Sequence, residues 1–477
     1  MNILDQRGKI VLFLILILGF SLRFYGAKIL PLNQDDIGSF SVAKSISFDP
    51  HDLKLPLIDK DPEDAGLVFH RYLIKIGEDL FGESNLGGRL PFVIFGVLTI
   101  LMLYFLVRPA LGTGVALLAC FLLSMDQFHI GISRVSDYNG VHLFFVTLSL
   151  YLFYKALKED QWYCHLINGL VIGVGFWVKE TMLLLIPTYI FYLMIVSEYR
   201  FWLKRRIFWL SFLISGLIML PEVYAILSAP GAPRYFYIAT NAKLGLSLNA
   251  TSLYLGELLL LMIKPNHEFF RQVFYDLGAQ LPMENFVLGS LTLCSVVFFL
   301  KEKNRFLKLM ILSFVINFIV FSFIRQYVAL DNIWAMSSFS WSCLGFIPGL
   351  IITSYFLVFL IKKYAWPASI VVILLLAYIF IRSVDIATYP IAAYFPARDH
   401  CIDEVQEWLD SIGFLDGQGT QPINDVKLLK SIYLATSDRP AYKRMAAIRL
   451  AAILEEQGKI KESRPYLAYL NSQADAR

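Results

Sequence analysis

The sequence predicts an all-α polytopic membrane protein, and three observations lead to this prediction. Hydrophobic residue types make up 57% of the 477 residues and charged types only 17%, with a mean hydropathy of +0.60. A soluble domain carries about a quarter charged residues. The apolar residues also gather into runs that are long enough to cross a bilayer. Finally, basic residues recur in every second connection between these runs, as the positive-inside rule requires.

We expect about eleven spans, and the charge pattern orients them. The first run, from Ile10 to about Tyr25, precedes charged and bulky residues instead of a small-residue cleavage site, so we interpret it as an anchor. Six basic connections fall on one side, which predicts a cytoplasmic N-terminus and an extracytoplasmic C-terminal domain in a protein of the plasma membrane. The expected spans are residues 9–27, 90–107, 113–126, 140–157, 162–178, 181–197, 207–227, 284–300, 307–325, 341–361 and 367–383.

Two connections on the predicted outer side are long, at residues 28–89 and 228–283. The first is acidic, and its second half, Val68 to Phe81, alternates apolar and charged residues at helical spacing, which predicts an interfacial helix. The second contains an apolar run from Leu253 to Met262 that is too short to span, so we expect a re-entrant or interfacial helix there. Outer loops of this length are usually functional.

The composition becomes charged and alanine-rich near residue 384, which divides the chain into two expected domains. Residues 1–383 form the transmembrane domain, and residues 384–477 form a small extracytoplasmic helical domain. In the second domain, Arg398 to Ile412 has the apolar periodicity of an amphipathic helix. Another helix is expected to open at Pro440 and to end at Gly458, because an early proline and a terminal glycine are typical of helix ends.

Composition also excludes some classes of site and partner. The five cysteines include no CxxC pair, so neither a disulfide framework nor a zinc cage is indicated. The net charge of +4 is modest, and we assign it to the cytoplasmic loops, so no nucleic-acid partner is expected.

An acidic pair follows the first span directly. Asp35 and Asp36 lie in the stretch Leu32 to Phe40, where a chain that leaves the bilayer reaches water. A carboxylate pair at that depth costs solvation energy unless it is used, paired or hydrated. A solvated loop acid, or a helix N-cap for Asp36, is the plain interpretation, and we favour the functional one.

Four motifs in chain order resemble those of membrane glycosyltransferases of the GT-C superfamily. The nearest branch is that of the protein O-mannosyltransferases and the lipid A aminoarabinose transferases, and Asp35-Asp36 falls where this branch has an acidic pair. The second motif, Phe81-Gly82-Glu83-Ser84-Asn85 followed by Arg89-Leu90-Pro91, resembles the signature that opens the second span of this branch. The third, Ile132 to Asp137, resembles its R-x-x-D motif. The fourth, Gly173 to Pro187 with Lys179, resembles its segment in which a lysine precedes a proline.

The chain also departs from the pattern of this branch. The second acid of the pair is Asp36 instead of glutamate, and Lys179-Glu180 stands where lysine-glycine is usual. The segment Arg444 to Tyr469 looks instead like a tetratricopeptide repeat, with a hairpin expected at residues 439–471. One and a half such repeats cannot bury a core alone, so we expect this tail to dock on the rest of the chain or to bind a protein partner.

The resemblance implies the transfer of a sugar from a polyprenyl-phosphate donor to a protein, lipid or glycan acceptor at the outer membrane face. It assigns Asp35 as the general base and Asp36 as its support or as a metal ligand. Arg134 and Lys179 are expected to bind the donor phosphate, with Arg89, Asp137 and Glu180 in supporting roles. A divalent metal ion is the one cofactor that the resemblance admits, with Asp36 and His129 as ligands.

Each of these residues has a plainer interpretation. Lys179 at the end of an apolar span could snorkel to the lipid headgroups, and Arg134 could be only the structural partner of Asp137. His129 and His70 could be ordinary interfacial residues.

Other functions fit parts of the sequence. A secondary transporter would explain the many spans, but no internal repeat with paired broken spans is present. A membrane scaffold would use the helical tail as a binding module. An oligosaccharyl transferase would carry a Trp-Trp-Asp tract, and no two tryptophans in this chain are adjacent. The sequence names neither the sugar nor the acceptor.

Overall fold

The computed structural model describes residues 3–29, 34–51, 54, 69–136, 138–228, 291–292, 294–299, 303–328, 343–387, 429 and 440–474. Within these ranges the regular structure is helical, apart from an isolated antiparallel bridge between Ser47 and Lys54. Five helices of the described part are long and apolar enough to cross a membrane. The predicted all-α membrane class is therefore confirmed.

The helices coincide with most of the expected spans. They are α1 (Ile3–Ile29), α2 (Gln34–Ala43), α3 (Phe69–Phe81), α4 (Asn85–Leu111), α5 (Thr113–Met125), α6 (Gln127–Ile132), α7 (Tyr138–Glu159), α8 (Trp162–Val178), η1 (Glu180–Leu184), α9 (Leu185–Ile195), η2 (Ser197–Lys204), α10 (Arg206–Ser228), α15 (Arg305–Val328), α17 (Cys343–Ala387), α21 (Pro440–Glu456) and α22 (Ile460–Ala474).

Some expectations differ from the structure or fall wholly or partly outside the described residues. The last two expected spans are joined as α17, which breaks at Ala365, where φ is 48°, two residues before Pro367. A proline inside a helix removes one backbone hydrogen bond and clashes with the preceding turn. The expected helices within 228–283 and 398–412 lie outside the described residues, and the span at 284–300 is described only in part. The total of eleven spans and the orientation of both termini stay predictions.

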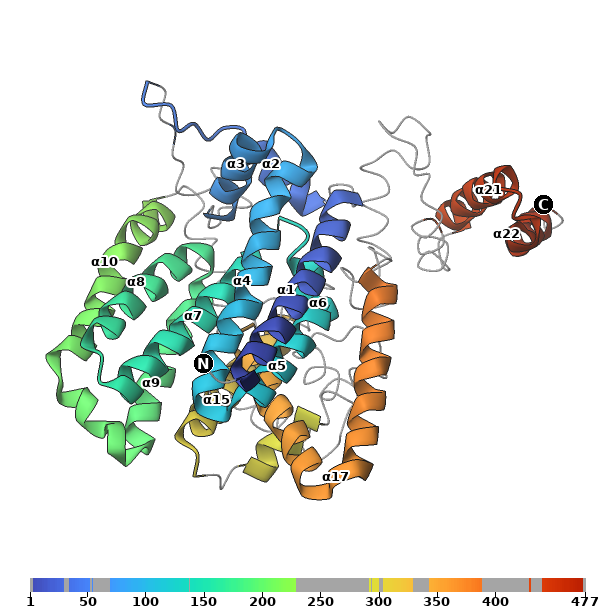
Figure 1. Cartoon of the computed structure of the whole chain (residues 1–477). Coiled ribbons are helices and arrows are strands. Elements are labelled where there is room, and N and C mark those ends of the chain that lie inside the picture. Colours follow the sequence, from blue (N-terminus) through green and yellow to red (C-terminus); the bar gives the residue numbers. More distant parts are fainter. Residues whose placement is uncertain are drawn as a thin grey trace.

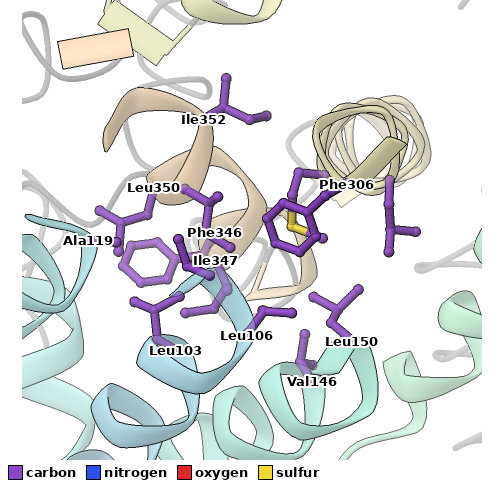
Figure 2. Packing of buried hydrophobic residues seen from close by; sticks show 14 of the residues in the cluster. Leu103, Leu106, Ala119, Val146, Leu150, Phe306, Phe346, Ile347, Leu350 and Ile352 are labelled. Atoms are coloured by element: carbon purple, nitrogen blue, oxygen red, sulfur yellow. The ribbon is translucent and has the colours of Figure 1, made fainter. Parts of the chain in front are cut away.

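The core of the bundle forms where the first half of α17 packs against α4, α5, α7 and α15. Figure 2 shows this packing, with side chains from all five helices directed toward one another. These helices are apolar on all faces, because one face packs against protein and the other against further spans or lipid. The labelled residues are Leu103, Leu106, Ala119, Val146, Leu150, Phe306, Phe346, Ile347, Leu350 and Ile352.

Helices α8 and α10 lie side by side and run in the same direction (Figure 1). At Gly169 a Cβ atom would lie 2.2 Å from the carbonyl oxygen of Ser211, so only glycine allows this approach. Ser215 Oγ donates to the Gly169 oxygen at 2.8 Å, and Trp177 Nε1 donates to the Ile218 oxygen at 2.9 Å. These contacts fix which turn of α10 lies beside which turn of α8.

Helices α2 and α3 lie at one end of the bundle, which we call the acid-pair end (Figure 1). Helix α3 coincides with the predicted interfacial helix, and its residues Leu73 and Ile74 pack with Phe40 of α2 and Phe92 of α4. The turn between α3 and α4 explains the motif Phe81-Gly82-Glu83-Ser84-Asn85. Gly82 has a φ of +96°, which favours glycine, and Ser84 caps α4 by accepting a hydrogen bond from the Gly87 amide at 3.0 Å.

The C-terminal helices α21 and α22 form a hairpin. Helix α21 begins at the expected Pro440, and Gly458 has a φ of +69° just after its end. Small and apolar side chains are buried where the two helices meet, among them Ala447, Leu450 and Leu454. The helix positions are those expected, whereas the likeness to a tetratricopeptide repeat and the domain boundary near residue 384 stay predictions.

Candidate functional site

The acid pair lies on a helix. Helix α2 begins at Gln34, so Asp35 and Asp36 occupy its first turn and do not precede it as a cap. The free backbone amides and the dipole of a helix N-terminus favour negative charge at this place. The backbone position alone is therefore compatible with an ionised Asp35, the form that a general base needs.

His70 fastens α2 to α3 one turn after the acid pair. Its Nε2 atom lies 3.1 Å from Ser39 Oγ, and both side chains are buried. The other side of the ring meets Tyr138, the first residue of α7, with 5.6 Å between ring centroids. Burial, and secondarily the neighbouring Arg71, lower the pKa of His70 to about 3. His70 is therefore a neutral link between the helix of the acid pair and the start of α7.

Lys179 lies at the junction of α8 and η1 and is buried in the protein. Only 2% of its surface is exposed, and its Nζ atom donates to Asn139 Oδ1 at 2.7 Å. The same ammonium group lies 5.1 Å from the ring centroid of Tyr138. This side chain is directed into the protein and not toward the headgroups, which disfavours the snorkelling interpretation.

Sequence reasoning missed the partners of Lys179. Asn139 is one of them, and His142 is its neighbour one turn further along α7, with Nε2 3.0 Å from Thr181 Oγ1. Both side chains are almost fully buried. Polar residues at helical spacing inside an apolar span were the available signal, because such residues in a membrane helix usually have a partner or a function.

A second group of buried cations surrounds the end of α1. Arg23, Arg89 and Arg134 are each completely buried. Arg23, which sequence reasoning also missed, donates to the backbone oxygens of Gly19 at 2.8 Å and of Leu123 and Ser124 at 3.2 Å. Its guanidinium therefore satisfies carbonyl groups that are left open at the end of α5, which is a structural role.

His129 is the fourth partner of Arg23. The two side chains meet at 2.6 Å between Arg23 Nη2 and His129 Nδ1, and the His129 amide donates to Asp126 Oδ1 at 2.7 Å. Since a guanidinium can only donate, Nδ1 accepts this hydrogen bond and cannot also bind a metal. In the part of the chain that the structure describes, no three His, Cys, Asp or Glu side chains gather as a metal site would need. The side chain of Asp36 lies outside the described residues, so metal ligation by Asp36 and His129 stays a prediction and no step below uses it.

Arg134 packs directly on α1. A Cβ atom at Gly26 would lie 2.4 Å from Arg134 Cδ, so the guanidinium stem occupies the space that a larger residue would fill. Arg89 donates from Nη1 to the Ala27 oxygen at 3.5 Å and is close enough to repel Arg134. Burial first, and then Arg89, lower the pKa of Arg134 to about 9. Two buried guanidinium groups that repel each other are stabilised by an anion.

The structure thus brings most of the predicted site residues to the acid-pair end. Arg134 lies in the connection between α6 and α7, and Tyr138, the first residue of α7, has its ring beside the Lys179 ammonium group. Glu180 begins η1 beside Lys179. Asp137 lies outside the described residues, as do the side chains of Asp35 and Asp36, so the roles of these three stay predictions.

A family model matches about a third of the chain. The model for dolichyl-phosphate-mannose-protein mannosyltransferases matches residues 65–224. That range contains Arg89, Arg134 and Lys179, and it begins after Asp35 and Asp36.

The relatives match the chain over part of its length. Over 190 residues it is 28% identical to the undecaprenyl phosphate-alpha-4-amino-4-deoxy-L-arabinose arabinosyl transferase of Pseudomonas paraeruginosa, which covers 37% of this chain and 32% of that protein. The matched segments span between 18% and 32% of the length of the first four curated relatives.

Solved structures share the fold over most of the chain. The archaeal oligosaccharyltransferase AglB from Archaeoglobus fulgidus, in complex with an inhibitory peptide and a dolichol-phosphate, has a TM-score of 0.53 and 14% identity, covering 88% of this chain and 59% of that one. ArnT from Cupriavidus metallidurans, bound to undecaprenyl phosphate, has a TM-score of 0.51 and 13% identity, covering 95% and 74%. The predicted resemblance to the GT-C superfamily is confirmed, and the fold is of that type.

Proposed function

We propose that this protein transfers a sugar from a polyprenyl-phosphate donor to an acceptor at the membrane surface, at the acid-pair end of the bundle. One observation carries the proposal. Buried cations gather near the helix that holds Asp35 and Asp36: Lys179 follows Val178, which packs with Phe40 of α2, and Arg89 and Arg134 lie at the end of α1. A GT-C fold and a relative that uses an undecaprenyl-phosphate sugar support the choice of donor.

Burial of these cations explains why the donor would be a phosphate. Ionised side chains in a membrane protein are costly unless an opposite charge or strong hydrogen bonds compensate them. Lys179 donates to the neutral amide of Asn139, and Arg89 is a cationic neighbour of Arg134. A lipid-linked phosphate is an anion that reaches this depth from the bilayer, with its prenyl chain remaining among the spans.

The proposed reaction balances on these groups. The acceptor oxygen attacks the anomeric carbon of the sugar and gives its proton to the Asp35 carboxylate. The bond between the anomeric carbon and the phosphate oxygen breaks, and the polyprenyl phosphate leaves with the electron pair. Lys179 and Arg134 stabilise the negative charge that grows on this phosphate. Asp36 supports Asp35, and the acceptor is a protein, lipid or glycan.

Two variants separate the roles of the acid and the cation. Asp35→Asn removes the base at almost constant volume, so transfer should fall by about 10²–10⁴-fold while donor binding persists. Lys179→Ala should instead weaken binding of undecaprenyl phosphate, on the order of 30-fold, because it removes a buried charged partner of the phosphate. The measurements are sugar release from radiolabelled donor lipid and the dissociation constant of undecaprenyl phosphate in nanodiscs.

Lys158→Ala is the matched control for Lys179→Ala. Lys158 is exposed at the other end of α7 and donates only to the Pro109 oxygen at 2.8 Å, so its loss should leave donor binding unchanged. Wild-type transfer by Asp35→Asn, with normal expression, would show that Asp35 is not the base. Solute transport by the Asp35→Asn variant would instead favour the transporter alternative.

A further inference from the structure

Glu222 is a buried carboxylate inside α10 that the proposed mechanism does not use. The contact from Trp177 to the Ile218 oxygen places the turn before Glu222 beside the last turn of α8. Glu222 follows Ile218 by four residues, so it lies at the level at which α8 ends and Lys179 begins the next turn. This carboxyl group is thus at the acid-pair end, at the same depth as the proposed phosphate site.

Nothing in the described part of the chain satisfies Glu222. Only 1% of its surface is exposed, and neither Oε1 nor Oε2 has a hydrogen-bond partner. Lys179, a buried cation at this end, donates to Asn139. A buried carboxyl group without a partner is costly in a protein interior and more so in a membrane. A position of this kind is retained where a ligand supplies the partner.

Tyr72 of α3 interacts electrostatically with Glu222. Burial, and then the carboxylate of Glu222, raise the pKa of Tyr72 to about 12. Tyr72 in turn packs on Phe48 with 6.3 Å between ring centroids, and Phe48 is 41% exposed. A few convergent polar groups beside an apolar or aromatic surface form the usual composition of a small-molecule site.

We propose that Glu222 is a sugar-recognition residue, whose carboxyl group accepts hydrogen bonds from hydroxyl or amino groups of the transferred sugar beside Tyr72. This inference rests on the proposed function, because it assumes that the donor phosphate binds at Lys179 and Arg134. The phosphate and the sugar of one donor then have separate binding groups, cations for the first and Glu222 for the second. Glu222 would accept a hydrogen bond from either kind of sugar. The donating group is a neutral hydroxyl in a hexose and a charged ammonium in an amino sugar.

Binding of three lipids to the full-length protein in nanodiscs tests this proposal. The probes are dolichyl-phosphate mannose, undecaprenyl phosphate-alpha-4-amino-4-deoxy-L-arabinose and undecaprenyl phosphate without a sugar. Glu222→Gln should weaken the binding of a sugar-carrying donor by about tenfold or more and leave the sugar-free lipid unchanged. Loss for the amino sugar alone identifies an ammonium partner, and loss for mannose identifies hydroxyl partners.

A second variant distinguishes recognition from a structural role. Glu222→Leu replaces an unsatisfied polar group by an apolar one of similar size, so the melting temperature should rise while discrimination among the three lipids is lost. Glu198→Gln is the control, because Glu198 is an exposed carboxylate that pairs with Arg305 at 3.2 Å and should change neither quantity much.

The outcomes separate this inference from the proposed function. If the wild-type protein binds none of the three lipids, the proposed function fails and this inference fails with it. If the wild-type protein binds the lipids and Glu222→Gln binds all three with wild-type affinity, only the sugar-recognition role is overturned. Equal weakening for the sugar-free lipid, or a lower melting temperature of Glu222→Leu, overturns it in favour of a structural role.

Discussion

At the scale of single residues, His70 connects the acid pair to the rest of the site. Its Nε2 atom meets Ser39 on α2, and its ring meets Tyr138, which covers Lys179. Because His70 links Ser39 of α2 to Tyr138 of α7, we infer that it is a positioning residue, which fixes where α2 holds Asp35 relative to the cations. A neutral imidazole with a pKa of about 3 can do this over the whole physiological pH range.

We expect the amide variants of His70 to differ according to their length. In His70→Gln the side-chain amide reaches the place of Nε2 and keeps the bond to Ser39, so transfer should remain near the wild-type rate. His70→Asn is one methylene shorter and loses the bond, so transfer should slow by roughly five- to tenfold, as for one lost hydrogen bond. The check is the turnover number of both variants at equal donor saturation, and equal rates would contradict the positioning role.

The lowered pKa of His70 also predicts a pH dependence of stability, which His70→Gln should lack. The folded protein holds His70 neutral, whereas in the unfolded chain it titrates near its ordinary pKa of 6.5. The unfolded state therefore binds more protons between pH 6.5 and about 3, and the stabilisation is full above this window and is lost as the pH falls. The melting temperature of the wild type should fall more steeply below pH 6.5 than that of His70→Gln.

Individual site residues could be predicted from the sequence only where a motif marked them. Arg134 and Lys179 stood in recognisable motifs, and the structure places both at the acid-pair end. Arg23 and Glu222 were visible as lone charges inside apolar runs, which is a signal by itself. What the sequence could not show is their surroundings, since Arg23 and His129 meet across 106 residues of chain and Glu222 is distinguished by the absence of a described partner.

At the scale of helices, the site depends on how closely α1 approaches the loop that carries Arg134. Gly26 leaves the space into which Arg134 packs, and a Cβ atom there would lie 2.4 Å from Arg134 Cδ and 3.0 Å from Nη1. Because the protein interior is densely packed, one added methyl group at this point displaces the guanidinium or the helix.

We therefore expect Gly26→Ala to weaken donor binding several-fold and to destabilise the protein by roughly 1–3 kcal/mol, as overpacking does. Gly216→Ala on α10 is the matched control, since nothing lies within 4 Å of its added Cβ atom. There alanine should raise stability slightly, by about 0.5–1 kcal/mol, because it has the better helix propensity. Lipid binding and thermal unfolding measure both effects, and unchanged donor binding by Gly26→Ala would separate Arg134 from the phosphate.

Helices were more predictable than single contacts, for a physical reason. A long apolar run must form a helix in a bilayer, so α1, α4, α7 and α10 followed from composition alone. Helix α2 was not expected as a helix, because ten residues with two acids and one glycine have no clear apolar period. Its position depends on packing of Phe40 against α3 and α4, which the sequence does not reveal.

At the scale of the whole molecule, the fold collects charged side chains of the described bundle at its two ends. The acid-pair end holds α2, α3 and the buried cations, and the other end holds exposed basic residues such as Lys158 and Arg205, which pairs with Asp160 at 2.7 Å. Arg205 also lies 4.3 Å from the ring centroid of Trp202, as expected of an aromatic and basic membrane boundary. The two ends thus differ in their charged groups: buried cations lie at the first and exposed basic residues at the second.

This difference predicts which end faces the cytoplasm. Glu83 is exposed in the turn between α3 and α4, and Glu159 is exposed at the opposite end of the bundle, after α7. Because basic connections stay in the cytoplasm, a cysteine at Glu83→Cys should react with a membrane-impermeant maleimide in intact cells, and one at Glu159→Cys only after permeabilisation. Cys294 is exposed, so both variants need a background in which it and Cys401 are serine. The reverse labelling would place Asp35, Lys179 and Glu222 on the cytoplasmic side, and the proposed transfer would then use donor lipids of that leaflet.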